Sequence, residues 1–149
     1  MTDDVMKKLR SLAQLDRDAT SVYGEALKHV EDEDVKTQFT EFRDEHEHHV
    51  NEISAAVLRL GGQAVEPEVD AMGHVADWFT AFRAMGGQRG ALHAMHTAEK
   101  YHNSRYADAV TWDVGDSALQ LTLERFYTEE KRHLEFVENK LDIHAQVAK

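Results

Sequence analysis

The sequence contains no cysteine. This absence excludes disulfides, cysteine nucleophiles and thiolate metal sites, and it leaves Asp, Glu and His as the side chains that could bind a metal ion. Positive charge is also scarce, because 17 Lys and Arg oppose 28 Asp and Glu and give a formal net charge of -11. A partner such as nucleic acid or an anionic membrane requires basic side chains to meet its phosphates. We therefore expect neither partner.

Long apolar runs are missing as well. No stretch approaches the roughly 18 apolar residues of a membrane-spanning helix, and the N-terminal MTDDVMKKLR lacks the apolar region of a signal peptide. We expect a cytoplasmic protein. The chain has one proline in 149 residues, which favours helices, and its length suffices for one domain with a sizeable core.

Apolar residues recur at helical spacing in four long segments, and turn-like stretches such as EDED and DVGDS separate them. The predicted helices cover about 3–31, 34–60, 88–112 and 117–146. Between the second and third lies a crossover with Pro67 and a short amphipathic helix, HVADWFTAFRAM, which would cap the bundle or bind a partner. The apolar side of this short helix comprises Val75, Trp78, Phe79, Phe82 and Met85.

This order of segments predicts an all-α, ferritin-like four-helix bundle, because two tight hairpins joined by one long crossover are typical of that arrangement. A bundle with short loops throughout fits the crossover less well. We expect a single domain over 1–149, with a hairpin at 3–60, the crossover at 61–87 and a second hairpin at 88–146.

The two predicted hairpins resemble each other in sequence. VYGEAL at 22–27 is similar to RYADAV at 105–110, which pairs Tyr23 with Tyr106 at an offset of 83 residues. In the second helix of each hairpin the offset is 84, and it pairs Phe42 with Phe126. Helix periodicity alone could align apolar residues, but the tyrosine pair and the nearly constant offset indicate an internal duplication.

Seven ionisable residues interrupt the apolar stripes at heptad spacing and should therefore point into the bundle core. They are Asp16, His46, His49, Glu99, His102, Glu130 and His133. Counted from the two hairpin turns at about 1.5 Å per residue, all seven fall in one layer roughly a helical turn thick. Glu25 shares a face with His29 but lies about 13 Å along the axis from Asp16. We exclude Glu25 from the layer.

Burial of so many ionisable groups costs several kcal/mol per charge unless they are paired or bind a metal. Carboxylates and imidazoles together suit one or two divalent ions, since Asp and Glu oxygens can bridge two ions and each neutral His supplies a nitrogen. A metal-free, hydrogen-bonded polar layer is the alternative. Tyr23 and Tyr106 lie one heptad from Asp16 and Glu99, where they either pack in the core or donate hydrogen bonds to the ligands.

The stretch DEHEHHVNEI at 44–53 contains two overlapping candidate pairs. Glu45 and His48 spell ExxH, whereas His46 and His49 continue the apolar stripe of their helix. We predict that His46 and His49 face the core, with Glu45 and His48 as the alternative inward pair. Weak metal binding at the surface by this histidine-rich stretch is a further interpretation.

Two stretches carry a family resemblance. EEKRHLEFVENKL at 129–141 resembles the last bundle helix of bacterioferritins and rubrerythrins, where the ExxH residues bind a di-iron centre. AEKYHNSRY at 98–106 resembles the third rubrerythrin helix, whose E-x-x-E supplies two ligands. The whole chain, with LGGQ after its second helix and a Trp-bearing crossover, is similar to a family of small ferritin-like, stress-associated proteins of unassigned function.

The resemblance implies that Glu130, His133 and Glu99 are ligands of a di-iron centre. The sequence departs from the pattern at Asp16 and His46, where the di-iron families have glutamate, and at His102. More nitrogen and fewer bridging carboxylates shift the preference toward zinc, so zinc and manganese stay alternatives to iron.

If iron binds, the implied chemistry is the oxidation of Fe(II) by oxygen or peroxide, in iron or oxidative-stress handling. The partners would be metal ions and small oxidants, and we leave a homodimer open. The alternative is a non-catalytic stress or interaction bundle with a structural metal or none. Whether the chain is an enzyme is not decided by its sequence.

Overall fold

The structure, a computed structural model, describes residues 3–65, 78 and 80–143, with only the backbone at 81–83. Within these residues there is no strand. The predicted all-α four-helix bundle is confirmed. Its helices are α1 (Asp3–Leu27), α2 (Glu33–Arg59), the short α4 (Thr80–Met85), α5 (Gly87–Ala109) and α6 (Ser117–Lys140).

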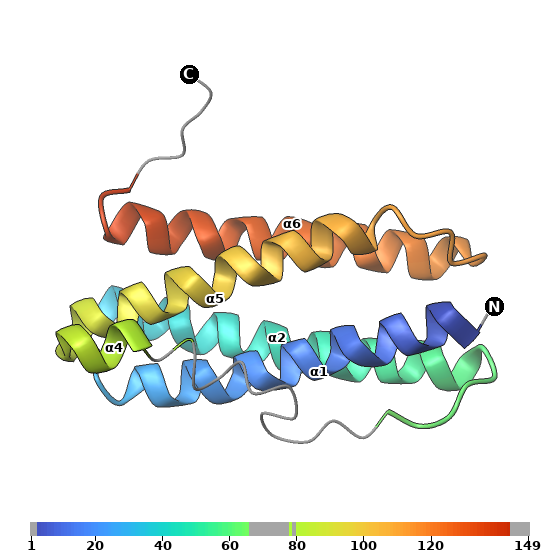
Figure 1. Ribbon diagram of the computed structural model, residues 1–149, viewed down its shortest axis with the longest axis horizontal. Coiled ribbons are helices and arrows are strands. Elements are labelled where there is room, and N and C mark those ends of the chain that lie inside the picture. The colour runs from blue at the N-terminus through green and yellow to red at the C-terminus, as the bar shows by residue number, and fades with distance from the viewer. Residues whose placement is uncertain (1–2, 66–77, 79, 144–149) are drawn as a thin grey trace.

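The bundle consists of two antiparallel hairpins, α1 with α2 and α5 with α6 (Figure 1). The hairpins dock through contacts of α1 with α5 and of α2 with α6. Figure 1 shows that α2 ends and α4 begins at opposite ends of the bundle. A short loop between the hairpins is therefore excluded, as the long predicted crossover requires.

Side-chain caps define where α2 and α6 begin. The Asp32 carboxylate accepts hydrogen bonds from the backbone N–H groups of Asp34 and Val35, at 2.8 and 3.2 Å. The Asp116 carboxylate accepts one from the N–H of Leu119 at 2.9 Å. Such caps satisfy amide groups that have no partner inside the helix. Both hairpins therefore turn at an acidic residue.

Three helices end earlier than the apolar pattern predicts. α1 ends at Leu27, α5 at Ala109 and α6 at Lys140. In each case a buried apolar residue lies just beyond the end of the helix, and it continues the helical spacing of apolar residues into the following loop. These residues are Val30, Trp112 and Leu141.

The short amphipathic helix agrees with its prediction only in part. Trp78 is buried and α4 packs against α5, as a capping helix should. Met85, predicted on the apolar side, is 53% exposed, because it is the last residue of α4 and Gly86 follows with φ 71°. Val75 and Phe79, the Phe82 side chain, and the crossover residues 66–72 with Pro67 lie outside the described residues.

The glycine pair after α2 allows a close approach to α1. Gly61 has φ 90°, which suits glycine. A Cβ atom at Gly62 would lie 2.8 Å from both Met6 Sδ and Val57 Cγ1. The end of the first hairpin is thus packed too tightly for a side chain at this position.

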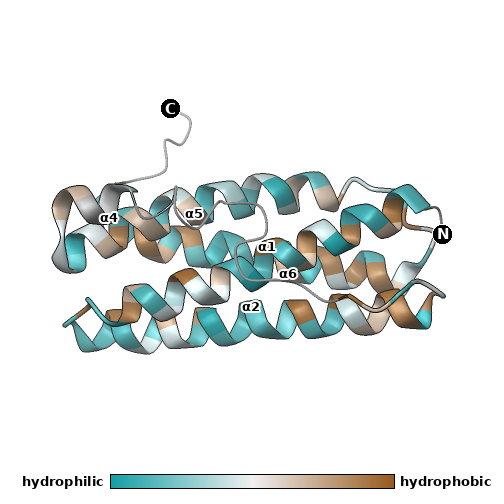
Figure 2. Cartoon of the chain, turned by 60° about the horizontal axis from the view of Figure 1, so that its bottom comes forward, coloured by the Kyte–Doolittle hydropathy of each residue, from teal (hydrophilic) through white to brown (hydrophobic). Residues whose placement is uncertain are grey.

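Large apolar and aromatic side chains fill the space between the helices, while the outer faces are mostly hydrophilic with separate hydrophobic bands (Figure 2). Tyr23, Phe39, Phe42, Tyr106 and Phe126 are all 0% exposed. Among the described residues, no helix is both long enough and apolar enough to cross a membrane. The core is interrupted at mid-height by the layer described next.

Candidate metal centre

All seven predicted residues of the layer are 0% exposed. The four long helices each contribute: α1 one residue, and α2, α5 and α6 two each. The prediction that these side chains point into the core is confirmed. Glu25, by contrast, has a 44% exposed side chain that pairs with His29 at 3.4 Å on the surface, and its exclusion was correct.

The structure decides between the two pairs in DEHEHHVNEI. The side chains of His46 and His49 are 0% exposed. The side chain of His48 is 61% exposed and pairs with Glu52 at 2.7 Å. Glu45 lies between these extremes at 22%. His46 and His49 are therefore the inward pair.

The layer brings potential ligand atoms together in two overlapping groups. One group comprises Asp16, His46, His49 and Glu130, and the other His46, Glu99, Glu130 and His133. Within each group, one nitrogen or oxygen of every residue lies within 4.8 Å of the others. His46 and Glu130 belong to both groups. The arrangement offers two neighbouring positions for cations.

His102 lies at the edge of these two groups. Its Nδ1 is 3.3 Å from Glu99 Oε1 and 3.8 Å from Glu130 Oε1. Its Nε2 has no hydrogen-bond partner among the described residues. The ring of Trp78 packs edge-on against it, with the ring centres 5.2 Å apart. Trp78 thus covers the layer, a contact that the sequence did not predict.

Glu130 is the most unusual side chain of the layer. Neither of its oxygens has a hydrogen-bond partner among the described residues, although it is fully buried. Instead, nitrogens of four imidazoles surround it at 3.4 to 3.8 Å. That is too long for a good hydrogen bond. Two ligand atoms on one tetrahedral metal ion, with bonds of about 2.1 Å, lie about 3.4 Å apart. The spacing around Glu130 therefore fits metal coordination.

Asp16 and Glu99 differ from Glu130 because each accepts a hydrogen bond from a tyrosine hydroxyl. The Tyr106 hydroxyl donates to Asp16 Oδ2, and the Tyr23 hydroxyl donates to Glu99 Oε2. Each tyrosine thus reaches a carboxylate of the other hairpin. Both predicted roles of the tyrosines are therefore observed, since the two rings are part of the core and their hydroxyls donate to the candidate ligands.

The pKa values of the three carboxyl groups in the layer are shifted in different directions. Burial alone would raise the pKa of Asp16, but the charge of His49 and hydrogen bonds from His46 and His49 outweigh it and hold this pKa well below its usual range. Glu99 also has a lowered pKa, through neighbouring histidines that outweigh burial. Burial raises the pKa of Glu130 well above its usual range, against the charge of His46, and the charge of Glu99 adds to the rise.

The histidines also differ in their affinity for protons. Burial lowers the pKa of His46, but the charge of Glu130 and the hydrogen bond to Asp16 more than compensate and raise it well above its usual range. Asp16 likewise raises the pKa of His49 against the effect of burial. For His102 burial prevails, and its pKa is lowered. Without a cation, protons therefore balance the charge of the layer.

Sequence reasoning did not predict the hydrogen bonds of two glutamates that lie just outside the layer. The Nε2–H of His133 donates to Glu45 Oε1 at 2.6 Å, and the Nε2–H of His49 donates to Glu129 Oε1 at 2.7 Å. Both hydrogen bonds cross between α2 and α6 and turn the Nδ1 atoms toward the layer. The available signal was the offset of 84 residues, which aligns Glu45 with Glu129.

The contacts around the layer obey an approximate twofold symmetry. Three kinds of contact occur twice, and the offsets of 83 and 84 residues convert one copy into the other. These are Tyr23–Glu99 with Tyr106–Asp16, His133–Glu45 with His49–Glu129, and the ring contacts His133–Phe42 with His49–Phe126. The symmetry supports the predicted duplication. It is broken where His46 corresponds to Glu130 and Ala19 to His102.

One further buried carboxylate lies on α1. Asp18 is 0% exposed and accepts a hydrogen bond from Gln14 Nε2 at 2.9 Å. It belongs to neither group of potential ligand atoms. Periodicity did not single out Asp18, because it lies off the heptad stripe of Asp16.

Comparison with known proteins assigns the chain to a protein family. No curated protein and no solved structure matches the chain. Residues 4–112 match a family described as a domain of unknown function, DUF2383. The matched part includes the layer residues of α1, α2 and α5, and it ends before α6. Since the match covers more than half of the sequence, the chain belongs to the DUF2383 family.

Proposed function

We propose that the buried layer is a dinuclear metal centre of a ferritin-like protein, and that iron is the metal it takes in preference. The observation that carries this proposal is Glu130, a fully buried carboxyl without a hydrogen-bond partner among the described residues. Leaving such a group unsatisfied costs about 1–3 kcal/mol. A cation between Glu130 and the surrounding imidazoles would remove that cost.

The two groups of potential ligand atoms suggest how the residues would share two ions. Asp16 and His49 belong to one position, and Glu99 and His133 to the other. Glu130 would be shared by both positions, since its Oε2 lies 3.8 Å from His49 Nδ1 and 3.4 Å from His133 Nδ1. His46 lies between them, with Nδ1 2.7 Å from Asp16 and Nε2 3.3 Å from Glu99. Its ring thus offers one nitrogen to each side.

Iron bound at this layer would supply electrons, since two Fe(II) ions provide the two electrons that one molecule of peroxide accepts. The chain itself provides a dry site, because every layer side chain is 0% exposed. The tyrosine hydrogen bonds hold Asp16 and Glu99 in place as anions, and Glu45 and Glu129 fix the ring orientation of two histidines. We infer a role in iron or oxidative-stress handling, with small oxidants as partners. The nitrogen-rich set also suits zinc, and manganese is a further alternative.

Native mass spectrometry after anaerobic reconstitution with Fe(II) tests the metal centre. We expect two ions per wild-type chain and a loss of at least one in Glu130→Ala/His133→Ala. The matched control is Glu25→Ala/His29→Ala, which removes an acid and a histidine from the surface and should retain both ions. No bound metal in the wild type, or an unchanged count in the layer variant, would refute the proposal.

A second candidate is a non-catalytic stress or interaction bundle with a structural metal or none. The hydrogen bonds of Asp16 with His46 at 2.7 Å and with His49 at 3.1 Å favour it, because they balance charge without a cation. The rate of Fe(II) oxidation separates the candidates. Oxidation no faster with the protein than in buffer supports the second. A homodimer and a cytoplasmic location stay predictions.

A further inference from the structure

We propose that divalent cations reach the buried layer through an acidic groove between α2 and α6, and that Glu45 and Glu129 form its inner end. This inference rests on the proposed metal centre and assigns to it an uptake route. It also assigns a second role to the two outer glutamates, beyond orienting His133 and His49.

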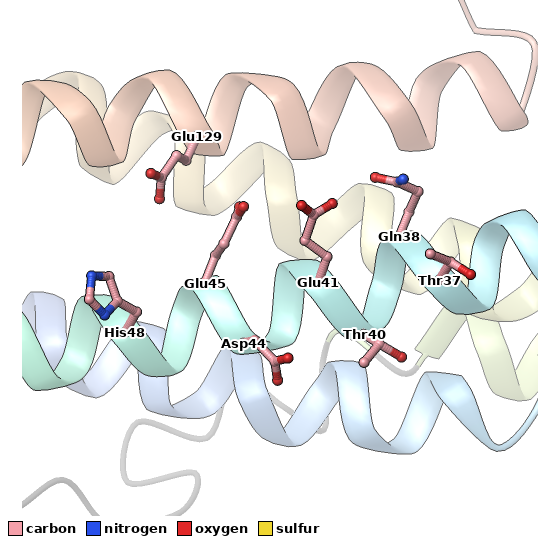
Figure 3. A pocket seen from close by; sticks show the side chains of 8 residues that line it. All are labelled: Thr37, Gln38, Thr40, Glu41, Asp44, Glu45, His48 and Glu129. Atoms are coloured by element: carbon pink, nitrogen blue, oxygen red, sulfur yellow. The ribbon is translucent and has the colours of Figure 1, made fainter.

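The groove has a volume of about 670 Å³ and is open to solvent. Four carboxylates line it, those of Glu41, Asp44, Glu45 and Glu129, and no Lys or Arg is among its lining residues. In Figure 3, Glu41 and Glu45 extend from α2 toward α6, and Glu129 extends from α6 toward Glu45. A cleft lined by one sign of charge concentrates ions of the opposite sign and speeds their association.

At the inner end of the groove, each glutamate touches both solvent and a buried ring. The side chains of Glu45 and Glu129 are 22% and 25% exposed, and they bond to His133 at 2.6 Å and to His49 at 2.7 Å. Both rings are 0% exposed and belong to the candidate ligand groups. A cation held by either glutamate is therefore one side chain away from the layer.

Behind these glutamates lie buried polar atoms without a hydrogen-bond partner among the described residues, which a bound cation would satisfy. Both oxygens of Glu130 and Nδ1 of His133 have no hydrogen-bond partner among the described residues, and both side chains are 0% exposed. His133 connects the groove with the layer, since its Nε2 bonds to Glu45 and its Nδ1 lies 3.4 Å from Glu130. The groove thus leads to the unsatisfied atoms of the layer.

The other sides of the bundle are less suited to passage of a cation. Between α1 and α5, Tyr23 and Tyr106 are 0% exposed and Trp78 is 4% exposed. The groove between α1 and α2 is lined by Arg17 and Arg43 and by one acidic residue, Glu47, so that positive charge prevails there. Compared with these two faces, the face between α2 and α6 is the more permissive one among the described residues.

Exposed ion pairs bridge α2 and α6, in addition to apolar contacts such as those of Phe39 and Phe42 with Phe136. Arg125 pairs with Glu52 at 2.7 Å, and Arg132 pairs with Glu45 at 2.6 Å. Such pairs contribute little to stability, and exposed side chains change rotamer within picoseconds to nanoseconds. The Arg132 side chain, 46% exposed, partly neutralises Glu45 and should slow the uptake of a cation.

The rate of cobalt(II) binding tests the route, measured by stopped-flow absorbance on the full-length, metal-free chain. Glu41→Gln/Asp44→Asn removes two groove charges without touching a histidine that is bonded in the layer. We expect the association rate at low ionic strength to fall about fivefold, with the final stoichiometry unchanged at two ions. The difference should disappear in about 1 M salt, where charges are screened within about 3 Å.

The matched control is Glu47→Gln/Glu135→Gln, which makes the same change in net charge on other faces of α2 and α6. Both residues are exposed, and they lie about 200° and 240° around their helices from Glu45 and Glu129. We expect a rate close to that of the wild type. Arg132→Gln should act in the opposite direction and raise the association rate about twofold, because it removes positive charge beside Glu45.

The outcomes separate the route from the metal centre. If the wild type binds two ions and the groove variant associates as fast as the control variant, the route is wrong and the metal centre stands. If the wild type binds no cobalt(II), iron or zinc, the proposed function is wrong, and the route with it. A slower groove variant with a normal control and a faster Arg132→Gln supports the route.

Discussion

The buried carboxyl of Glu130 leads to a prediction in which metal reverses the sign of a stability change. We expect Glu130→Met to stabilise the metal-free protein and to destabilise the metal-loaded protein relative to the wild type. Methionine has a similar length and is flexible enough to fill the same space. It removes two oxygens that have no hydrogen-bond partner among the described residues.

The magnitude follows from what those oxygens lose on burial. An unsatisfied buried polar group costs about 1–3 kcal/mol, so the metal-free variant should be more stable by about that amount at neutral pH. The gain should depend on pH. The folded state raises the pKa of Glu130 above its usual value of 4.5, so it binds more protons than the unfolded state. Glu130 therefore makes the wild type lose stability as the pH rises above 4.5 toward the folded pKa, and the variant lacks this contribution.

Bound metal should make the wild type more stable than Glu130→Met. An ion at 100 times its dissociation constant adds about 2.7 kcal/mol to the free energy of unfolding, and two ions add about twice that to the wild type. Urea denaturation in chelator and in excess metal measures both values. A control, Leu123→Met, alters a fully buried apolar residue one heptad away on α6 and should cost less than about 1.5 kcal/mol, independently of metal. A metal-free Glu130→Met that is less stable than the wild type by over about 1 kcal/mol would refute the reasoning, because Glu130 would then make stabilising contacts.

Three further predictions concern other groups. Because the pKa values of His46 and His49 are raised, a cation must displace protons, and its affinity should increase as the pH rises from 6 to 8; calorimetry in buffers of different ionisation enthalpy would detect the protons released. A pH-independent affinity would contradict this. Tyr23→Phe and Tyr106→Phe should each destabilise the metal-free protein by about 1–3 kcal/mol, and by similar amounts, because each removes the hydroxyl donor of one buried carboxylate oxygen; unequal losses in urea denaturation would argue against the twofold relation. Gly24→Ala should stabilise the protein by about 0.5–1 kcal/mol in thermal unfolding, since Gly24 lies within α1 and a Cβ atom there meets nothing within 4 Å; a loss of stability would show that α1 needs glycine there.

The fold and the layer could be predicted because each depends on helical periodicity. A polar residue at a position where every seventh neighbour is apolar has to enter the core, and residues at equal distances from a turn have to lie at equal height. Those two rules located Asp16, Glu99 and Glu130 without knowledge of any contact. The same rules excluded Glu25 from the layer, and the exposure of its side chain confirms that exclusion.

The sequence was less informative about which side chains meet. Tyr23 lies one heptad from Asp16, which is about 10.5 Å along a helix and too far for the two to bond. The antiparallel neighbour supplies the partner instead, so that Tyr23 bonds to Glu99. The hydrogen bonds of Glu45 and Glu129 were not predicted because both side chains are partly exposed at the flank of the α2–α6 contact. Periodicity identifies the face of a helix, not the rotamer at its edge.

The exchange of hydrogen bonds between the hairpins has a consequence for folding. Tyr23 and Glu99 belong to different hairpins, and so do Tyr106 and Asp16. A hairpin that collapsed alone would bury a carboxylate whose tyrosine donor is on the other half of the chain. Docking of the two halves therefore completes the polar layer of each, and the bundle should unfold in one cooperative step, without a stable half-folded intermediate.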